Sequence, residues 1–248
     1  MLARIVIGLA VSAICFAIAG RRFFWLSKLV RSGKEANRTW GGFRRAKEGV
    51  TAEVVEVAGQ KKLLKWTVPG LAHFFTMWGF TVLLTTILEA YGALFNRDFA
   101  IPFIGRSNWL AALEDFFATA VLLSLLVFSA IRIKNAPARK DRASRFYGSH
   151  LGAAWAVLGM ISLVIITLLV YRGAQINTGH FPFITDGAVQ SDSSVAHNQA
   201  LTSPWAFASQ LVASLLAPLG VHTNAILEAV FLLANIGVIT GFLVFVSY

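Results

Sequence analysis

Five long blocks of apolar residues constrain this chain more than any other feature of its sequence. Each block has about 20 residues or more, which is the length that an α-helix needs to cross the roughly 30 Å of hydrocarbon in a bilayer. Of the 248 residues, 56% are apolar and 14% are charged, whereas roughly 25% of the residues of a soluble domain are charged. This composition excludes a soluble enzyme, a disordered chain and a disulfide scaffold. It predicts an all-α integral membrane helical bundle, a single transmembrane domain over residues 1–248, with spans at residues 2–20, 66–94, 109–131, 150–171 and 224–248.

Two parts of this pattern leave alternatives open. A cleaved signal peptide is the competing interpretation of the first block, but Arg21 and Arg22 follow it directly, which favours a span retained in the membrane. Residues 204–220 are short for a crossing and are bounded by Pro204 and Pro218. We therefore expect an interfacial helix there, with a sixth span as the alternative.

The basic residues predict the orientation of the bundle. The formal net charge is +10, and 18 of the 22 Lys and Arg residues lie between spans, in residues 21–65 and 132–145. Basic residues in short loops mark the cytoplasmic side of a membrane protein. The N-terminus is therefore expected outside and the C-terminus in the cytoplasm. The same distribution argues against a nucleic-acid partner and favours attraction to anionic lipid headgroups as a secondary role.

The chain has one cysteine, Cys15, inside the first apolar block. An intramolecular disulfide is therefore impossible, and so is an iron–sulfur cluster held by cysteines of this chain, because such a cluster needs several thiolates. Any redox chemistry here requires another cofactor.

His73 is the residue that points most clearly to such a cofactor. It is predicted about two turns inside the second span, where an ionisable side chain is costly and usually functional. Neutral imidazole is a common axial ligand of haem iron, and a b-type haem needs no covalent attachment motif. Gly70, Thr76, Met77 and Phe80 share its helical face and would give a porphyrin room and packing surface. The alternative is a histidine hydrogen-bonded to a neighbouring helix.

The other histidines are less informative. His150 opens the fourth span on the same side of the membrane as His73. It is a candidate for the second axial ligand, for a contact to a haem propionate, or for a histidine at the headgroup level. Three histidines are expected on the other side, mainly in solvated loops, and cannot share a haem with His73: His180, His197 and His222.

Acidic and basic residues are expected together near the outer ends of the spans. Glu89, Glu228 and the pair Glu114 and Asp115 would share this layer with arginines, namely Arg97, Arg106 and Arg172. Interfacial ion pairing is the first interpretation; proton exchange with solvent or with a quinol headgroup is the functional one. Asn235, near the middle of the last span, is expected to make an interhelical hydrogen bond.

Several segments together resemble a known family. The resemblance covers nearly the whole chain and is strongest from about residue 57 to residue 179. It is carried by VPGLAHFFTMWGF, EAYG, IPFIG, RFYGSH and YRGAQINTG, which are Val68–Phe80, Glu89–Gly92, Ile101–Gly105, Arg145–His150 and Tyr171–Gly179. These segments are similar to the membrane domain of actinobacterial membrane-bound iron–sulfur oxidoreductases, which are heterodisulfide-reductase-like. That domain is itself similar to the gamma subunit of respiratory nitrate reductase.

The resemblance implies a multi-pass domain of a bacterial plasma membrane that precedes a cytoplasmic iron–sulfur domain. Such proteins pass electrons between an electron-transfer flavoprotein and menaquinone. It also implies that His73 is a haem b ligand on the cytoplasmic side. On this basis the chain is expected to be a fragment that lacks the C-terminal iron–sulfur domain.

Two departures limit what is carried over. The nitrate reductase gamma subunit has two histidines about three turns apart in its second span, and Leu83 stands where the second would be. One haem is therefore expected. The partner histidine of that family comes from the inner end of the fifth span, which here stops at Tyr248 without one. The second ligand is then either His150 or a residue beyond the end of this chain.

The sequence therefore predicts the haem b membrane module of a quinone-linked oxidoreductase. It would relay electrons between a cytoplasmic iron–sulfur domain, supplied by an electron-transfer flavoprotein, and menaquinone. The alternative is a haem-free membrane anchor and quinone-docking bundle for a redox partner. A transporter or channel subunit is disfavoured, because the spans show few paired intramembrane charges or broken helices.

Overall fold

The computed structural model of the protein describes residues 2–33, 42–135, 152–183 and 202–248. Five helical segments of this part are long and apolar enough to cross a membrane. The prediction of an all-α, multi-pass membrane bundle is confirmed to that extent. The helices are α1 (Leu2–Arg31), α2 (Gly42–Ala52), η1 (Glu53–Ala58), η2 (Leu63–Lys65), α3 (Thr67–Phe95), α4 (Asn108–Lys134), α6 (Ala153–Thr178), α7 (Phe207–Leu216), η4 (Ala217–Leu219) and α8 (Gly220–Ser247).

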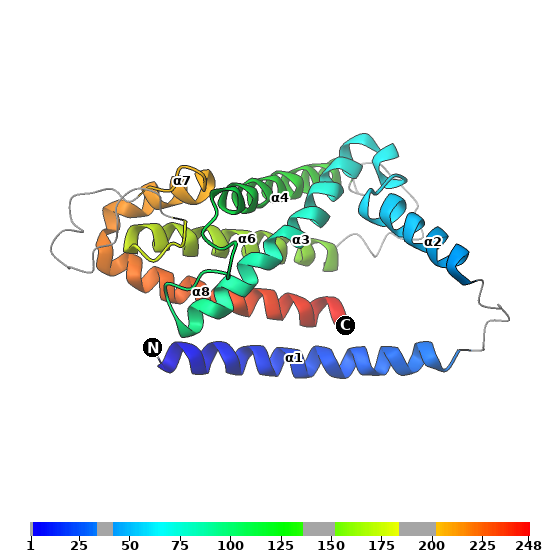
Figure 1. The fold of residues 1–248 in the computed structure, drawn as a ribbon, viewed down its shortest axis with the longest axis horizontal. Helices are drawn as coiled ribbons and strands as arrows, with labels where there is room; N and C mark the ends of the chain where they lie inside the picture. The colour runs from blue at the N-terminus through cyan, green and yellow to red at the C-terminus, as the bar shows by residue number, and fades with distance from the viewer. Residues whose placement is uncertain (1, 34–41, 136–151, 184–201) are drawn as a thin grey trace.

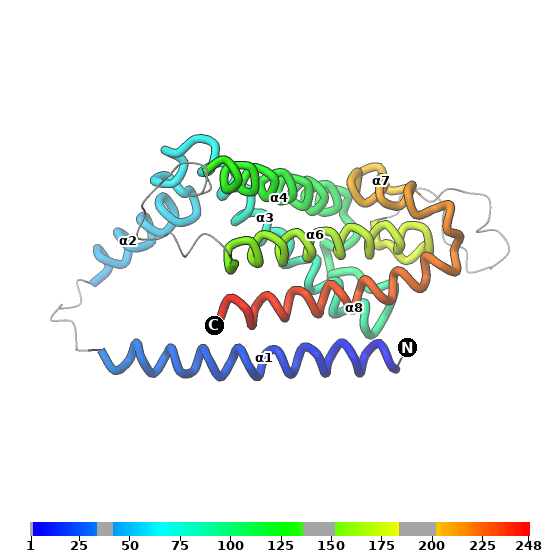
Figure 2. The backbone as a smooth tube through the Cα atoms, turned by 180° about the vertical axis from the view of Figure 1, so that it is seen from behind, coloured from blue at the N-terminus to red at the C-terminus, as the bar shows by residue number. Residues whose placement is uncertain are grey.

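Successive long helices run in alternating directions (Figure 1). We call the end where α1, α4 and α8 finish and α3 and α6 begin the basic end, because the described parts of the two Lys- and Arg-rich segments lie beside it. The other is called the opposite end. The N-terminus lies at the opposite end and the C-terminus at the basic end, and the view from behind shows α1 running beside α8 (Figure 2).

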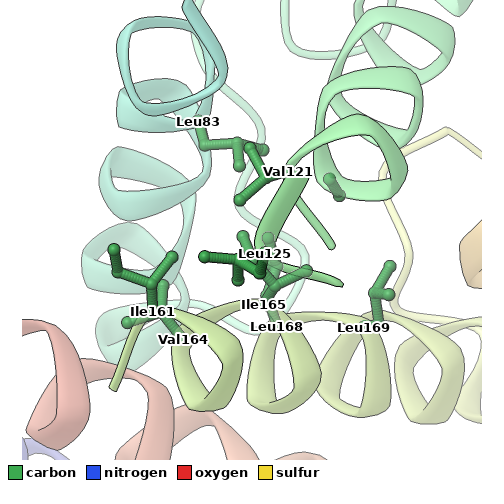
Figure 3. Packing of buried hydrophobic residues seen from close by; sticks show 9 residues of the cluster. Leu83, Val121, Leu125, Ile161, Val164, Ile165, Leu168 and Leu169 are labelled. Atoms are coloured by element: carbon green, nitrogen blue, oxygen red, sulfur yellow. The ribbon is translucent and has the colours of Figure 1, made fainter. Parts of the chain in front are cut away.

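A core of apolar side chains joins α3, α4 and α6 within the bundle (Figure 3). Large apolar side chains on the outward faces, such as Leu84, Leu88 and Leu126, are more than half exposed, which is the surface that a bilayer covers. Because lipid tails are as apolar as leucine, close packing holds such a core together. The buried members are Leu83, Ala118, Val121, Leu125, Ile161, Val164, Ile165, Leu168 and Leu169.

α1 extends beyond the predicted span. The apolar block ends at residue 20, but the helix continues through basic residues to Arg31. Nε of Arg22 donates to the backbone oxygen of Ser247 at 3.2 Å, and its guanidinium lies 5.4 Å from the centre of the Tyr248 ring. The basic extension of α1 therefore binds the last turn of α8.

α6 also runs further than the sequence predicted. The predicted span ended at Tyr171, but the helix continues to Thr178 and stops at Gly179, whose φ is +80°. The backbone N–H of His180 bonds to the oxygen of Gln175, as in helices that end with a left-handed residue. The predicted start, His150, lies outside the described residues, and α6 begins at Ala153.

The segment expected in the membrane interface forms a short helix that packs on the bundle. α7 has 10 residues and contacts α6 and α4. Gly173 of α6 permits this approach, because a Cβ atom there would lie 2.8 Å from Cγ1 of Val212 and 2.9 Å from the backbone nitrogen of Ala213. η4 then turns the chain into α8.

Asn235 makes the interhelical hydrogen bonds that the sequence predicted. Its Nδ2 donates to the backbone oxygen of Val164 and to Oγ1 of Thr167, both at 2.9 Å. Replacing Asn235 with leucine should lower the free energy of unfolding by about 0.6 to 1.7 kcal/mol, the range for interhelical hydrogen bonds in a membrane bundle. Unfolding in mixed micelles measures this change. A stability equal to that of the parent chain would show that these bonds contribute nothing.

Candidate functional site

His73 lies near the start of α3, at the basic end, with an exposed side chain. The segment that precedes α3 folds back against it, since a Cβ on Gly70 would meet the backbone of Leu63 and Leu64. Gly70 is therefore small because a backbone passes over it. The prediction that Gly70 makes room for a porphyrin is not needed to explain this glycine.

Gln60 holds the His73 ring through its side-chain amide. Nδ1 of His73 lies 3.1 Å from Oε1 of Gln60, and Nε2 of Gln60 donates to Sδ of Met77 at 2.8 Å. Gln60 is only 5% exposed, and its φ of +47° is uncommon for a residue other than glycine. Such a conformation persists only where its surroundings hold it, which here places the amide between His73 and Met77.

This hydrogen bond fixes the tautomer of His73. The amide oxygen of Gln60 only accepts, so Nδ1 of His73 donates this hydrogen bond, and in the neutral ring the lone pair is on Nε2. Nε2 has no hydrogen-bond partner among the described residues. A metal-binding histidine almost always donates its other ring N–H in this way. Such an arrangement would suit a metal ligand, with Nε2 of His73 as the ligating atom and Gln60 as the group that orients the ring.

The face of α3 that carries His73 leads to an apolar cavity of about 430 Å³. Phe80, two helical turns after His73, lines it and stacks on Phe242 of α8 with ring centres 6.2 Å apart. Leu83, which stands where the resemblance places a second histidine, lines the same cavity. α6 and α8 supply the facing walls.

The two other histidines that the structure describes do not join His73. Nδ1 of His180 lies 2.7 Å from Oδ1 of Asp98, in the region beyond the opposite end of α3. His222 is exposed in the first turn of α8, also at the opposite end. His150 and His197 lie outside the described residues. Within the part of the chain that is described, no three His, Cys, Asp or Glu side chains form a metal-binding group.

A second site lies at the opposite end, between α3, α4 and α6. We call Glu89, Glu114, Asp115 and Arg172 the buried charged cluster, since none of the four is more than 8% exposed. Nη1 of Arg172 donates to Oε2 of Glu114 at 2.7 Å, and Oγ1 of Thr85 donates to Oε1 of Glu114 at 2.6 Å. Both oxygens of Glu114 are therefore hydrogen-bonded.

Asp115 is held by the first turn of α7. Its two oxygens accept hydrogen bonds from the backbone nitrogen and the hydroxyl group of Ser209, at 2.7 and 2.8 Å. The guanidinium of Arg172 also lies over the rings of Phe181 and Phe183, 5.0 and 5.5 Å from their centres. The buried arginine is thus covered by aromatic rings.

Another ion pair, between Arg97 and Glu228, lies at the same end of the bundle. Nε and Nη2 of Arg97 donate to the two oxygens of Glu228 at 3.0 and 2.6 Å, and the hydroxyl group of Thr178 donates to Oε2 at 2.7 Å. The hydrogen bond to Glu228 raises the pKa of Arg97, because it stabilises the charged guanidinium. Ion pairing of Glu114 with Arg172 and of Glu228 with Arg97 agrees with the first interpretation of these residues.

Sequence reasoning missed the polar residues that complete both sites. Gln60 precedes α3 in a basic segment, and nothing in its neighbours distinguishes it. Ser209 comes just after the start of α7, a common position for a side chain that bonds to an acidic group, but its partner Asp115 is 94 residues away. Such long-range pairs depend on helix packing, which this sequence alone does not reveal.

No known protein family, curated protein or solved structure matches this chain. The functional assignment therefore rests on these two sites.

Proposed function

We propose that this chain is the haem b membrane module of an electron-transfer oxidoreductase. It relays electrons between a cytoplasmic iron–sulfur domain, which an electron-transfer flavoprotein supplies, and menaquinone in the plasma membrane of a bacterium. The observation that carries the proposal is the hydrogen bond between His73 and Gln60, because it engages Nδ1 and leaves Nε2 without a partner among the described residues at the basic end of the bundle.

The charge distribution supports the orientation that this function needs. With the basic end in the cytoplasm, the N-terminus lies outside and the C-terminus inside. His73 then lies near the cytoplasmic surface, where an iron–sulfur partner docks. The opposite end, with the buried charged cluster, faces the outside.

The residues have distinct roles in this proposal. His73 would hold the haem iron through Nε2, and Gln60 orients the ring by accepting the hydrogen bond from Nδ1. His150 is the candidate for the second ligand within this chain. The bound haem supplies one-electron transfer, and the surrounding apolar helices exclude water and set the dielectric.

A reduced-minus-oxidised absorption spectrum of the purified chain tests the proposal. We expect the Soret and α bands of a b-type haem. They should be lost in His73→Ala and shifted in Gln60→Leu, which removes the acceptor for Nδ1. His180→Ala is the matched control, since His180 lies at the opposite end. If the chain binds no haem, the haem-free anchor and quinone-docking bundle replaces this proposal.

A further inference from the structure

One side chain of the buried charged cluster has no partner. Glu89 is 8% exposed, yet it makes no hydrogen bond with any described residue, and its Oε1 is fully buried. Nε and Nη2 of Arg172 are also buried without a hydrogen bond. Glu89 and Arg172 are near enough to interact electrostatically. Buried polar atoms that stay unpaired in a native protein require an explanation, such as a bound molecule.

The other carboxylates of the cluster are fully engaged. Glu114 is bonded by Arg172 and Thr85, and Asp115 by Ser209. They hold α4 against its neighbours, so their roles are structural. Glu89 alone is free to bind something else.

The charges of the cluster make the Glu89 carboxylate a good proton acceptor. The cluster has three carboxylates and one guanidinium. The carboxylates of Glu114 and Asp115 alone carry more negative charge than the single positive charge of Arg172 neutralises. From α6, Tyr171 also interacts with Glu89, and it adds no positive charge. A proton placed on Glu89 reduces the excess negative charge in a region of low dielectric constant.

The unpaired atoms define the chemistry of the missing group. Nε and Nη2 of Arg172 need an acceptor, and the carboxylate of Glu89 needs a donor. A hydroxyl group provides both through one oxygen atom. Within a lipid bilayer, two sources of such a group are water and the head of a hydroquinone.

The apolar cavity favours the hydroquinone. Thr86 of α3 and Leu168 of α6 line the cavity, and Glu89 and Arg172 follow them by three and four residues, one helical turn nearer the opposite end. The cluster therefore lies within one helical turn of residues that line a cavity of about 430 Å³. The apolar lining suits the isoprenoid tail of a quinone, and the cluster suits its polar head.

We propose that Glu89 and Arg172 hold a hydroxyl group of a hydroquinone between them, and that Glu89 takes the proton which this hydroxyl group releases. The O–H bond of the hydroquinone breaks, an O–H bond forms on Glu89, and the guanidinium of Arg172 stabilises the resulting hydroquinone anion. No electron moves in this step. The inference rests on the proposed function for its substrate class, but it assigns the head-group site to residues that bind no haem.

Two probes test the site in the full chain, reconstituted in lipid nanodiscs. Menadiol supplies the head group without a tail, and menaquinol supplies both. Glu89→Ala should weaken binding of each probe by about tenfold, as expected for losing a hydrogen bond to a charged group. Glu89→Gln should retain most of the affinity, because its amide oxygen still accepts. Asp98→Asn, an exposed carboxylate at the same end, is the matched control and should bind as the parent chain does.

Infrared difference spectra report the proton directly. Adding menadiol should produce the C=O stretching band of a protonated carboxyl group in the parent chain and in Asp98→Asn, and no such band in Glu89→Gln. Equal affinity in Glu89→Ala and Asp98→Asn, or a band that persists in Glu89→Gln, would overturn the inference. So would a spectrum that menadiol leaves unchanged, since the hydroxyl group would then be water.

These readouts are independent of the haem. If no haem bands that depend on His73 are found, but binding of the two probes depends on Glu89, the proposed function is overturned and the head-group site is retained. If the haem bands depend on His73, but binding of the probes does not depend on Glu89, the proposed function is retained and the head-group site is overturned. Because Glu89 makes no hydrogen bond with the described residues, both variants should unfold at the parent temperature, and thermal unfolding checks this.

Discussion

Replacing Arg172 with methionine should lower the free energy of unfolding by about 3–5 kcal/mol, the cost of removing one partner from a buried ion pair. Arg172 is 2% exposed, and its loss leaves Glu114 and Asp115 as uncompensated buried charges. Methionine keeps much of the side-chain volume, so little of the effect comes from a cavity. Reversible unfolding of the parent chain and the variant in mixed micelles measures the difference.

A double-variant cycle separates the ion pair from other effects of this change. Glu114→Gln combined with Arg172→Met should be less destabilised than the sum of the two single variants, because each removes the charge that the other leaves unpaired. Arg44→Met is the matched control, since Arg44 pairs with Glu48 at 3.1 Å on the surface, where both side chains are more than half exposed. A loss as large in Arg44→Met as in Arg172→Met would contradict the special role of the buried pair.

The sequence predicted the spans well because hydrocarbon thickness sets their length, whatever the helices pack against. It failed at the end of α6, where Tyr171 and Arg172 look like a membrane boundary. Arg172 instead finds Glu114 inside the protein, so the helix continues until Gly179 ends it. A charged residue therefore marks the end of a membrane span only when water solvates it, and not when another side chain inside the protein pairs with it.

The candidate sites were likewise predictable only in part, because some of their contacts depend on how the helices pack. His73 could be singled out from the sequence as a candidate because an ionisable side chain inside a span is rare and costly. Its partner Gln60 could not, because the contact depends on a backbone with a positive φ and on the close approach that Gly70 allows. The acidic layer was predicted, but which carboxylate is unpaired depends on hydrogen bonds that only packing creates.

The packing of α7 on α6 provides the second large effect. Gly173→Leu should lower the free energy of unfolding by about 2–4 kcal/mol, combining overpacking with loss of hydrogen bonds to a buried carboxylate. A side chain at residue 173 meets backbone atoms of α7, including the nitrogen of Ala213 at 2.9 Å, and backbone cannot rotate away as a flexible side chain can. α7 must then move, which draws Ser209 from Asp115.

Gly159→Leu is the matched control for this prediction. Gly159 lies on the same helix, is exposed, and has nothing within 4 Å of an added Cβ atom, so the same substitution there should change stability by less than about 0.5 kcal/mol. Adding Ser209→Ala to Gly173→Leu should cost little more, because the hydroxyl bond to Asp115 is already lost. If Ser209→Ala costs the same in both backgrounds, α7 has stayed in place and the coupling between helix packing and the buried charged cluster is absent.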